Sequence, residues 1–294
     1  MSEVVELLQH LIRSQCVNDG NAESGHEIRN AELIDDFLAG SGADTASYEP
    51  APGRGSVLAR IEGSDPDAPT LLYMGHTDVV PANPEHWRED PFGAELIDGE
   101  VWGRGAVDML NLTASMGVAF RRLATSGWRP RVKLLYLAVA DEEATGRHGA
   151  GWLTEHALDD VRADYVITES GGIPIPTPAG MRLPVVVAEK GCYWCTLRIK
   201  GTAGHASTPL RTDNALVTAA EVVRRIDEHK GEAVIHEAWR RFVEGMAMPA
   251  EIAEMMLDPA KIDDLVEALP NLGLARQAHA CTHTTIAPTV MRAG

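Results

Sequence analysis

Cysteine is scarce in this 294-residue sequence, which contains four: Cys16, Cys192, Cys195 and Cys281. Four cysteines, scattered over the sequence apart from the neighbouring Cys192 and Cys195, are too few for a disulfide scaffold. No apolar run approaches the roughly 18 residues that a membrane span needs. The N-terminal stretch is amphipathic and carries Glu3 and Glu6 where a signal peptide would have basic residues. We therefore expect a cytoplasmic protein with no membrane partner.

Basic residues are also in short supply. Lysine and arginine number 26 against 43 aspartates and glutamates, which gives a net charge of -17. A surface this acidic repels phosphate backbones and anionic lipids, so we expect no nucleic-acid partner. It leaves many carboxylates, some of which could bind cations. The sequence has no glycine loop with phosphate-binding spacing and no serine nucleophile elbow.

The first 190 residues alternate between strand-like and helix-like segments. Apolar runs typical of buried strands cover residues 56–61, 70–75, 132–140 and 164–168. Helical spacing of apolar residues covers 2–14, 27–38 and about 107–125. Asp98-Gly99 lies between two short strand-like pieces and predicts a hairpin. This alternation predicts an α/β domain with a mostly parallel, buried sheet.

The pattern changes near Gly191. Residues 192–201 alternate like a strand with one solvated face, 214–229 read as a helix, 231–270 look helical and charged, and 281–290 are another strand candidate. We therefore expect a small α+β domain over residues 191–294, placed after, or inserted into, the α/β domain that begins with residues 1–190.

Chemically capable side chains follow the predicted strands at four places. His76 and Asp78 follow one strand, Asp108 precedes the long helix, and two further clusters follow the remaining strands: Asp141-Glu142-Glu143 and Glu169. Ligands of open α/β sheets bind beyond the carboxyl ends of the strands. Imidazole and several carboxylates could therefore converge on one crevice.

The charge of such a crevice favours metal binding. Several carboxylates in one place repel each other and take up protons unless cations neutralise them. Two divalent ions bridged by one carboxylate would do so. Mixed imidazole and carboxylate ligands suit zinc, with cobalt or manganese as alternatives. A carboxylate outside the metal shell would then be a general base.

Each of these residues also has an ordinary structural explanation. A lone histidine at a strand end is commonly structural, residues 141–143 could form a solvated helix cap, and Asp108 could cap the helix that follows it. The recurrence of one strand-end placement four times favours the shared site.

Five segments in this order carry a resemblance to a known family: GHTDVV, GRGAVDM, DEEATGRHG, TESGG and GTAGHASTP. They resemble the co-catalytic zinc peptidase and amidohydrolase family of aminoacylase, succinyl-diaminopimelate desuccinylase, acetylornithine deacetylase and glutamate carboxypeptidase. The resemblance implies a zinc-peptidase-like catalytic domain and a small lid domain that forms a homodimer.

The resemblance also implies metal ligands. His76 would bind one ion, Asp108 would bridge both ions, Glu143 would bind the second, and Glu169 would complete the shell of the first. In this family the peptide bond after the bridging aspartate is commonly cis.

Three further residues would be catalytic by the same resemblance. Asp78 would orient the ring of His76, and Glu142 would be the general base for the bridging water. His205, in the lid, would reach the partner subunit's active site and help to hold the oxyanion. The alternative for His205 is an ordinary exposed loop histidine.

The family's last ligand of the second metal is a histidine in a C-terminal stretch that returns to the catalytic domain. This sequence ends before such a stretch, and neither His279 nor His283 is assigned to the role. We expect the chain to be a fragment of a longer protein, the alternative being a naturally shortened and impaired form. One metal position would then be under-coordinated in this chain.

The leading functional prediction is a metal-dependent hydrolase of amide bonds in small peptides or N-acyl amino acids. By the same resemblance, Glu169 argues against an aminopeptidase, because aspartate is usual at this position in the family's aminopeptidases. The alternative is a catalytically impaired dimeric scaffold or binding protein with the same fold. The retained Glu142 argues against that alternative, because a scaffold has no use for it.

Overall fold

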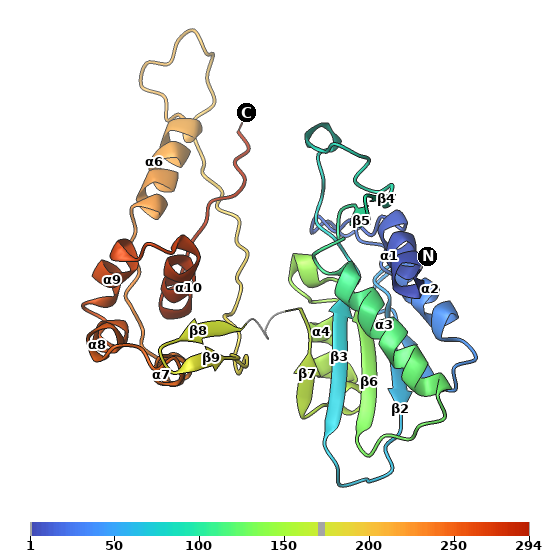
Figure 1. Ribbon diagram of the computed structural model, residues 1–294. Helices are drawn as coiled ribbons and strands as arrows, with labels where there is room; N and C mark the ends of the chain where they lie inside the picture. The colour runs from blue at the N-terminus through green and yellow to red at the C-terminus, as the bar shows by residue number, and fades with distance from the viewer. Residues whose placement is uncertain (1, 170–173, 294) are drawn as a thin grey trace. The chain divides into compact units, whose positions relative to one another are not determined.

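The structure is a computed structural model that describes residues 2–169 and 174–293 (Figure 1). The chain divides into two compact units, Met1–Ser170 and Gly171–Gly294. This division falls earlier than the boundary predicted at residue 190. The functional domains 1–190 and 191–294 stay a prediction.

The first unit is built on a five-stranded sheet with the order β1-β2-β6-β3-β7. The strands are β1 (Asp44–Tyr48), β2 (Ser56–Ile61), β3 (Thr70–His76), β6 (Lys133–Val139) and β7 (Tyr165–Ile167). β3 pairs in parallel with β6 and β7, whereas β2 pairs antiparallel with β1 and β6. Four strands therefore run in one direction and β2 runs against them. The predicted α/β fold with a mostly parallel sheet is confirmed.

Helices cover both faces of this sheet, and this explains the continuous apolar run in β6. Successive side chains of a strand point to opposite faces. On one face, Leu134 and Tyr136 pack with α1 (Glu3–Arg13), α2 (Ile28–Leu38) and α3 (Leu110–Thr125). On the other face, Leu135 and Leu137 pack with α4 (Ala150–His156) and α5 (Leu158–Val161). A strand buried on both sides needs apolar residues at every position.

The predicted helices of this unit form close to their expected bounds, with one informative difference. Residues 107–109, expected inside the long helix, form turns before α3 begins at Leu110. The peptide bond between Asp108 and Met109 is cis, as the resemblance implies. The predicted hairpin forms between β4 (Glu95–Ile97) and β5 (Glu100–Trp102).

The regular secondary structure in the described residues of the second unit is mostly helical. A short hairpin of β8 (Ile175–Thr177) and β9 (Gly180–Arg182) precedes five helices. The helices are α6 (Ala215–Asp227), α7 (Glu237–Gly245), α8 (Ala250–Leu257), α9 (Ile262–Ala268) and α10 (Leu272–Thr282). Trp239, Met256 and Ile262 form the centre of its core, and the indole of Trp239 donates a hydrogen bond to the carbonyl of Met256 at 2.8 Å.

Two strand predictions for this unit were wrong. Residues 192–201 have no regular secondary structure and are almost entirely exposed. Residues 281 and 282 end helix α10, and residues 283–290 are irregular. A strand forms only against a neighbour that satisfies its backbone groups. Between residues 174 and 293, β8 and β9 pair only with each other, so neither segment has a sheet to join.

Among the residues that the structure describes, none of the helices has the length and apolarity required to cross a bilayer.

Candidate metal centre

Three neighbouring strands end at one edge of the first unit's sheet and carry the predicted site residues. His76 is the last residue of β3. The helical turn η2 (Glu142–Ala144) follows β6, and Glu169 follows β7. Asp108 lies just before α3, which packs against β3. Because parallel strands share the edge at which they end, these positions converge.

His76 is buried and turns its two ring nitrogens to different partners. Nδ1 lies 2.9 Å from the main-chain carbonyl oxygen of Asp78 and 3.4 Å from its carboxylate. Nε2 lies 3.2 Å from Oδ1 of Asp108, 3.4 Å from Oε2 of Glu169 and 3.8 Å from Oε2 of Glu142. The side chain of Asp108 is 70% exposed. The contacts of Nδ1 with Asp78 fix the orientation of the ring, and Nε2 points at the three carboxylates.

Two groups of possible ligand atoms result, each with all atoms within 4.8 Å of one another. His76, Asp108 and Glu169 form one group, and His76, Glu142 and Glu143 form the other. His76, not Asp108, is common to both groups. The first group contains the residues predicted for one metal ion, whereas Glu143 lies with the predicted general base. The individual roles stay predictions.

The electrostatics of this cluster favour a cation. Burial opposes the charged form of His76, but the hydrogen bond and charge of Asp78, with the charges of Glu142 and Glu169, raise its pKa to about 10. Burial, together with neighbouring carboxylates, raises the pKa of Glu143 to about 7. The pKa values of Glu142 and Glu169 are raised for the same reasons. The cluster thus holds protons that a divalent cation would displace.

These donors fit a metal ion by their chemistry. One imidazole nitrogen with its other nitrogen hydrogen-bonded, together with carboxylate oxygens, is a common zinc ligand set. The same set accepts cobalt or manganese.

Asp78 contacts more than the ring of His76. Its carboxylate is fully buried and accepts hydrogen bonds from the backbone N–H groups of Glu142 and Glu143 at 3.2 and 3.0 Å. Burial by itself would raise the pKa of Asp78, but the hydrogen bonds from His76 and Asn18 outweigh it and lower the pKa. Asp78 therefore joins β3 to the turn that carries both glutamates.

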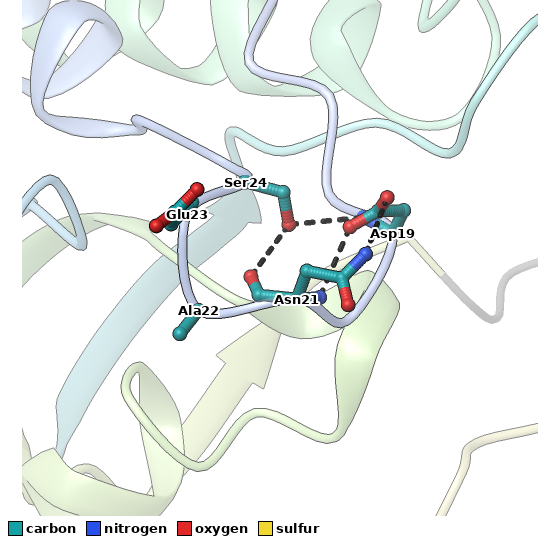
Figure 2. A pocket seen from close by; sticks show the side chains of 5 residues that line it. All are labelled: Asp19, Asn21, Ala22, Glu23 and Ser24. Atoms are coloured by element: carbon teal, nitrogen blue, oxygen red, sulfur yellow. Dashed lines mark hydrogen bonds between the residues drawn. The ribbon is translucent and has the colours of Figure 1, made fainter.

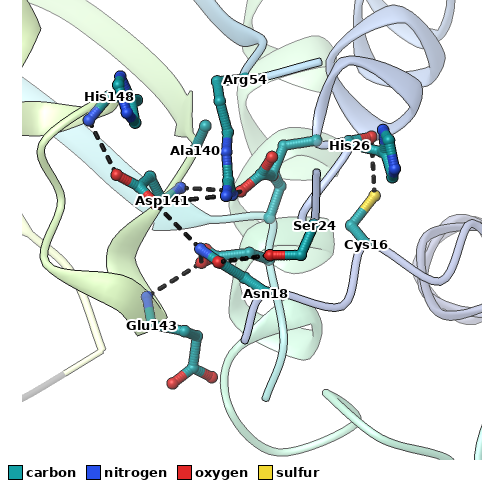
Figure 3. Close-up of polar contacts among 12 residues, drawn as sticks. Cys16, Asn18, Ser24, His26, Arg54, Ala140, Asp141, Glu143 and His148 are labelled. Atoms are coloured by element: carbon teal, nitrogen blue, oxygen red, sulfur yellow. Dashed lines mark hydrogen bonds and ion pairs between the residues drawn. The ribbon is translucent and has the colours of Figure 1, made fainter. Parts of the chain in front are cut away.

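A buried polar network, which no sequence pattern predicts, lies behind these residues. Asn18, Glu27 and Arg54 are each at most 3% exposed and contact Asp141. Figure 3 shows Asn18 and Arg54 beside Asp141. The guanidinium of Arg54 donates to Glu27 at 2.8 Å. The three residues come from separate loops and a helix end, so no spacing connects them. A polar residue within an apolar stretch of sequence would have suggested burial, but the residues that flank these three positions form no such stretch.

A small surface pocket lies on the loop after Asn18 (Figure 2). Its lining residues are Asp19, Asn21, Ala22, Glu23 and Ser24. The Asp19 carboxylate accepts a hydrogen bond from the backbone of Asn21 at 3.0 Å, and the Ser24 hydroxyl donates to the carbonyl of Asn21 at 2.8 Å. The loop thus bonds to itself, and none of the predicted site residues lines the pocket.

His205 belongs to the second compact unit. It is exposed, and its Nδ1 lies 2.7 Å from the hydroxyl of Ser207. Its predicted role in a partner's active site stays a prediction.

Comparison with known proteins identifies the family of this chain. The sequence profile of peptidase family M20/M25/M40 matches residues 72–284. Succinyl-diaminopimelate desuccinylase of Maricaulis maris is 33% identical over 161 residues, which are 54% of this chain and 40% of that protein. N-fatty-acyl-amino acid synthase/hydrolase PM20D1 of Xenopus tropicalis is 27% identical over 251 residues, which are 81% of this chain and 48% of that protein.

A solved structure shares the fold. The M20 family metallo-carboxypeptidase Sso-CP2 from Sulfolobus solfataricus superposes with a TM-score of 0.59 at 18% identity, covering 95% of this chain and 63% of that one. The chain spans less than half the length of the curated relatives it matches. The ordered motifs, the strand-end cluster and the matched profile together show that this chain belongs to peptidase family M20/M25/M40.

Proposed function

We propose that this chain provides the metal centre of a hydrolase that cleaves amide C–N bonds in small peptides or N-acyl amino acids. One observation carries the proposal: Nε2 of His76 converges with carboxylate oxygens of Asp108 and Glu169 where three strands end. The relatives named as a desuccinylase and an N-fatty-acyl-amino acid synthase/hydrolase support this class of substrate.

The proposed cofactors are two divalent ions, with zinc preferred and cobalt or manganese as alternatives. His76, Asp108 and Glu169 would hold one ion, and Asp108 and Glu143 would contribute to the other. When bound, such ions polarise an amide carbonyl and lower the pKa of water. The contact between His76 Nδ1 and Asp78 keeps Nε2 directed at the ion.

Glu142 is the proposed general base. Its carboxylate lies beside the first group of ligands without belonging to it, and its side chain is half exposed. It therefore reaches both the side of the ligand group and solvent. Glu142 would accept the proton of the attacking water and deliver it to the leaving amine nitrogen.

The proposal includes a homodimer through the second domain, with His205 of each subunit serving the other's site. The exposure of His205 supports this arrangement, because the hydrogen bond of Nδ1 to Ser207 leaves Nε2 available. The division into a catalytic domain (1–190) and a lid (191–294) and a cytoplasmic location are parts of the same proposal.

A hydrolysis assay with and without a chelator tests the function. The full-length protein would be supplied with a panel of dipeptides and N-acyl amino acids. We expect cleavage that a chelator abolishes and that added zinc, cobalt or manganese restores. An equal rate of cleavage with and without the chelator would contradict a metal-dependent mechanism. Metal-saturated protein that cleaves none of the panel would favour the scaffold alternative.

A further inference from the structure

Asp141 adopts a backbone conformation that is uncommon for a residue with a side chain. Its φ is 67°, in the left-handed region, at the point where β6 turns into η2. Such a conformation is strained and persists only where the surroundings fix it. Four hydrogen bonds hold Asp141: its N–H with Glu27, its carboxylate with Asn18 and with the N–H of His148, and its carbonyl with the N–H of Gly146. The guanidinium of Arg54 lies 3.6 Å from the same carboxylate.

Of these hydrogen-bond partners, Asn18 also contacts Asp78, the residue behind His76. Its amide nitrogen lies 2.9 Å from Oδ2 of Asp78 and 3.0 Å from Oδ1 of Asp141. Both carboxylates are buried, at 0% and 2% exposure. Two buried carboxylates around one point repel each other. An NH₂ group has two hydrogens and offers one to each of them.

The orientation of this amide is determined by its other end. Oδ1 of Asn18 accepts a hydrogen bond from the N–H of Gly20 at 3.1 Å, and it lies 3.3 Å from the hydroxyl of Ser24, whose hydrogen is directed at the carbonyl of Asn21. A flipped amide would place its oxygen against two carboxylates and its nitrogen against the N–H of Gly20. Aspartate has the same shape as asparagine but would bring a third carboxylate into this space. The position therefore requires an amide.

The two carboxylates held by Asn18 control the turn that carries the glutamates. Asp78 accepts the backbone N–H groups of Glu142 and Glu143. Asp141 directly precedes both residues and sets the direction of the chain. Asn18 thus acts on the same turn by two routes, one through each aspartate.

We propose that Asn18 is a positioning residue of the metal centre, whose amide joins Asp78 to Asp141 and so fixes the turn that presents Glu142 and Glu143. Asn18 lies outside residues 72–284, which the family profile matches. The effect of Asn18 on metal binding rests on the proposed function, whereas its hydrogen bonds to Asp78 and Asp141 form without any metal ion.

Two variants and one matched control test this proposal. Asn18→Asp keeps the shape and removes the donor, and Asn18→Ala removes the side chain. The control Gln9→Glu makes the same change of amide to acid at a buried donor in α1, which bonds to the carbonyl of Ala94 at 2.7 Å. The first readout is amide hydrogen exchange over residues 141–148 in the metal-free chain. The second is cobalt affinity, from the visible absorption of the bound ion.

In both Asn18 variants, the backbone amides of residues 141–148 should exchange their hydrogens several-fold faster than in the unaltered chain. The amides of β6 should keep their protection. Cobalt affinity should fall by about 10- to 100-fold, as for other residues that orient ligands. Gln9→Glu should change neither quantity. If Asn18→Asp does not fold, Asn18→Ala decides alone.

Two results would overturn the proposal. One is unchanged exchange over residues 141–148 in a folded Asn18 variant. The other is equal acceleration in β6 and in residues 141–148, since that would mean general destabilisation. Because exchange is measured without metal or substrate, a failure of the proposed hydrolase function would not imitate either result.

Discussion

Nδ1 of His76 lies 2.9 Å from the carbonyl oxygen of Asp78, two residues further along the chain. This contact places a hydrogen on Nδ1 of the neutral ring and leaves the lone pair on Nε2. Nε2 is the nitrogen that faces the carboxylates. A local turn after β3 thus selects the ring nitrogen that can bind a metal ion.

The first prediction concerns the proton transfer. Glu142→Gln keeps the size of the side chain and removes its basicity, while the group of His76, Asp108 and Glu169 stays complete. We expect unchanged metal content and a fall in turnover of about 10²- to 10⁴-fold. Metal content by atomic emission and steady-state kinetics measure the two quantities. Turnover close to that of the unaltered protein would disprove the assignment of Glu142.

The second prediction concerns pH and stability. Burial of Glu27, with the charge of Asp78, outweighs its hydrogen bonds and Arg54 and raises its pKa from 4.5 to about 7. A carboxyl with a higher pKa in the folded state binds its proton more tightly when folded. The protonation of Glu27 therefore contributes to the free energy of unfolding below pH 4.5, and this contribution is lost as the pH rises towards 7.

Glu27→Gln removes this titration. The stability of the variant relative to the unaltered protein should rise by at most about 3 kcal/mol across this interval. Urea unfolding at both ends of the interval measures the difference. If the difference in stability between the variant and the unaltered protein does not change with pH, then Glu27 is already ionised in the folded protein over the whole interval.

The third prediction concerns the packing of β3 against α3. A Cβ on Gly75 would overlap Oγ1 of Thr113 and lie 3.2 Å from Cε of Met116. The Thr113 hydroxyl donates to the carbonyl of His76 at 2.8 Å. Gly75→Ala should therefore lower the free energy of unfolding by about 1–3 kcal/mol.

The control for this variant is Gly245→Ala, at the end of α7. No atom lies within 4 Å of a Cβ built there. Its effect should stay within about 1 kcal/mol, the difference in helix propensity. Equal effects of the two variants would argue against close packing at Gly75.

The fourth prediction concerns the proposed dimer. His205→Ala subunits and Glu142→Gln subunits of the full-length protein should each be inactive alone. In a mixed dimer, one site has Glu142 from one subunit and His205 from the other, so some activity should return. Mixed dimers verified by mass spectrometry that remain inactive would mean that His205 acts within its own chain or not at all.

The strand-end residues could be predicted from the sequence for a physical reason. Buried parallel strands such as β3 and β6 are apolar on both faces, so they stand out, and a polar residue directly after one lies at a known edge of the sheet. The positions of His76, Glu142 and Glu169 follow from this rule.

Other features depend on contacts that no local pattern encodes. The alternation in residues 192–201 predicts a strand, yet a strand also needs a partner, and the described residues of that unit offer none to it. Asn18 contacts Asp78 and Asp141 across 60 and 123 residues of sequence. Only the folded chain brings such residues together.

Anomalous X-ray diffraction from crystals grown with cobalt tests the central claim most directly, because it locates the ion itself. We predict a peak about 2.0–2.2 Å from Nε2 of His76 and from carboxylate oxygens of Asp108 and Glu169. A cobalt peak elsewhere in the crystal, with none in contact with His76, would contradict the account.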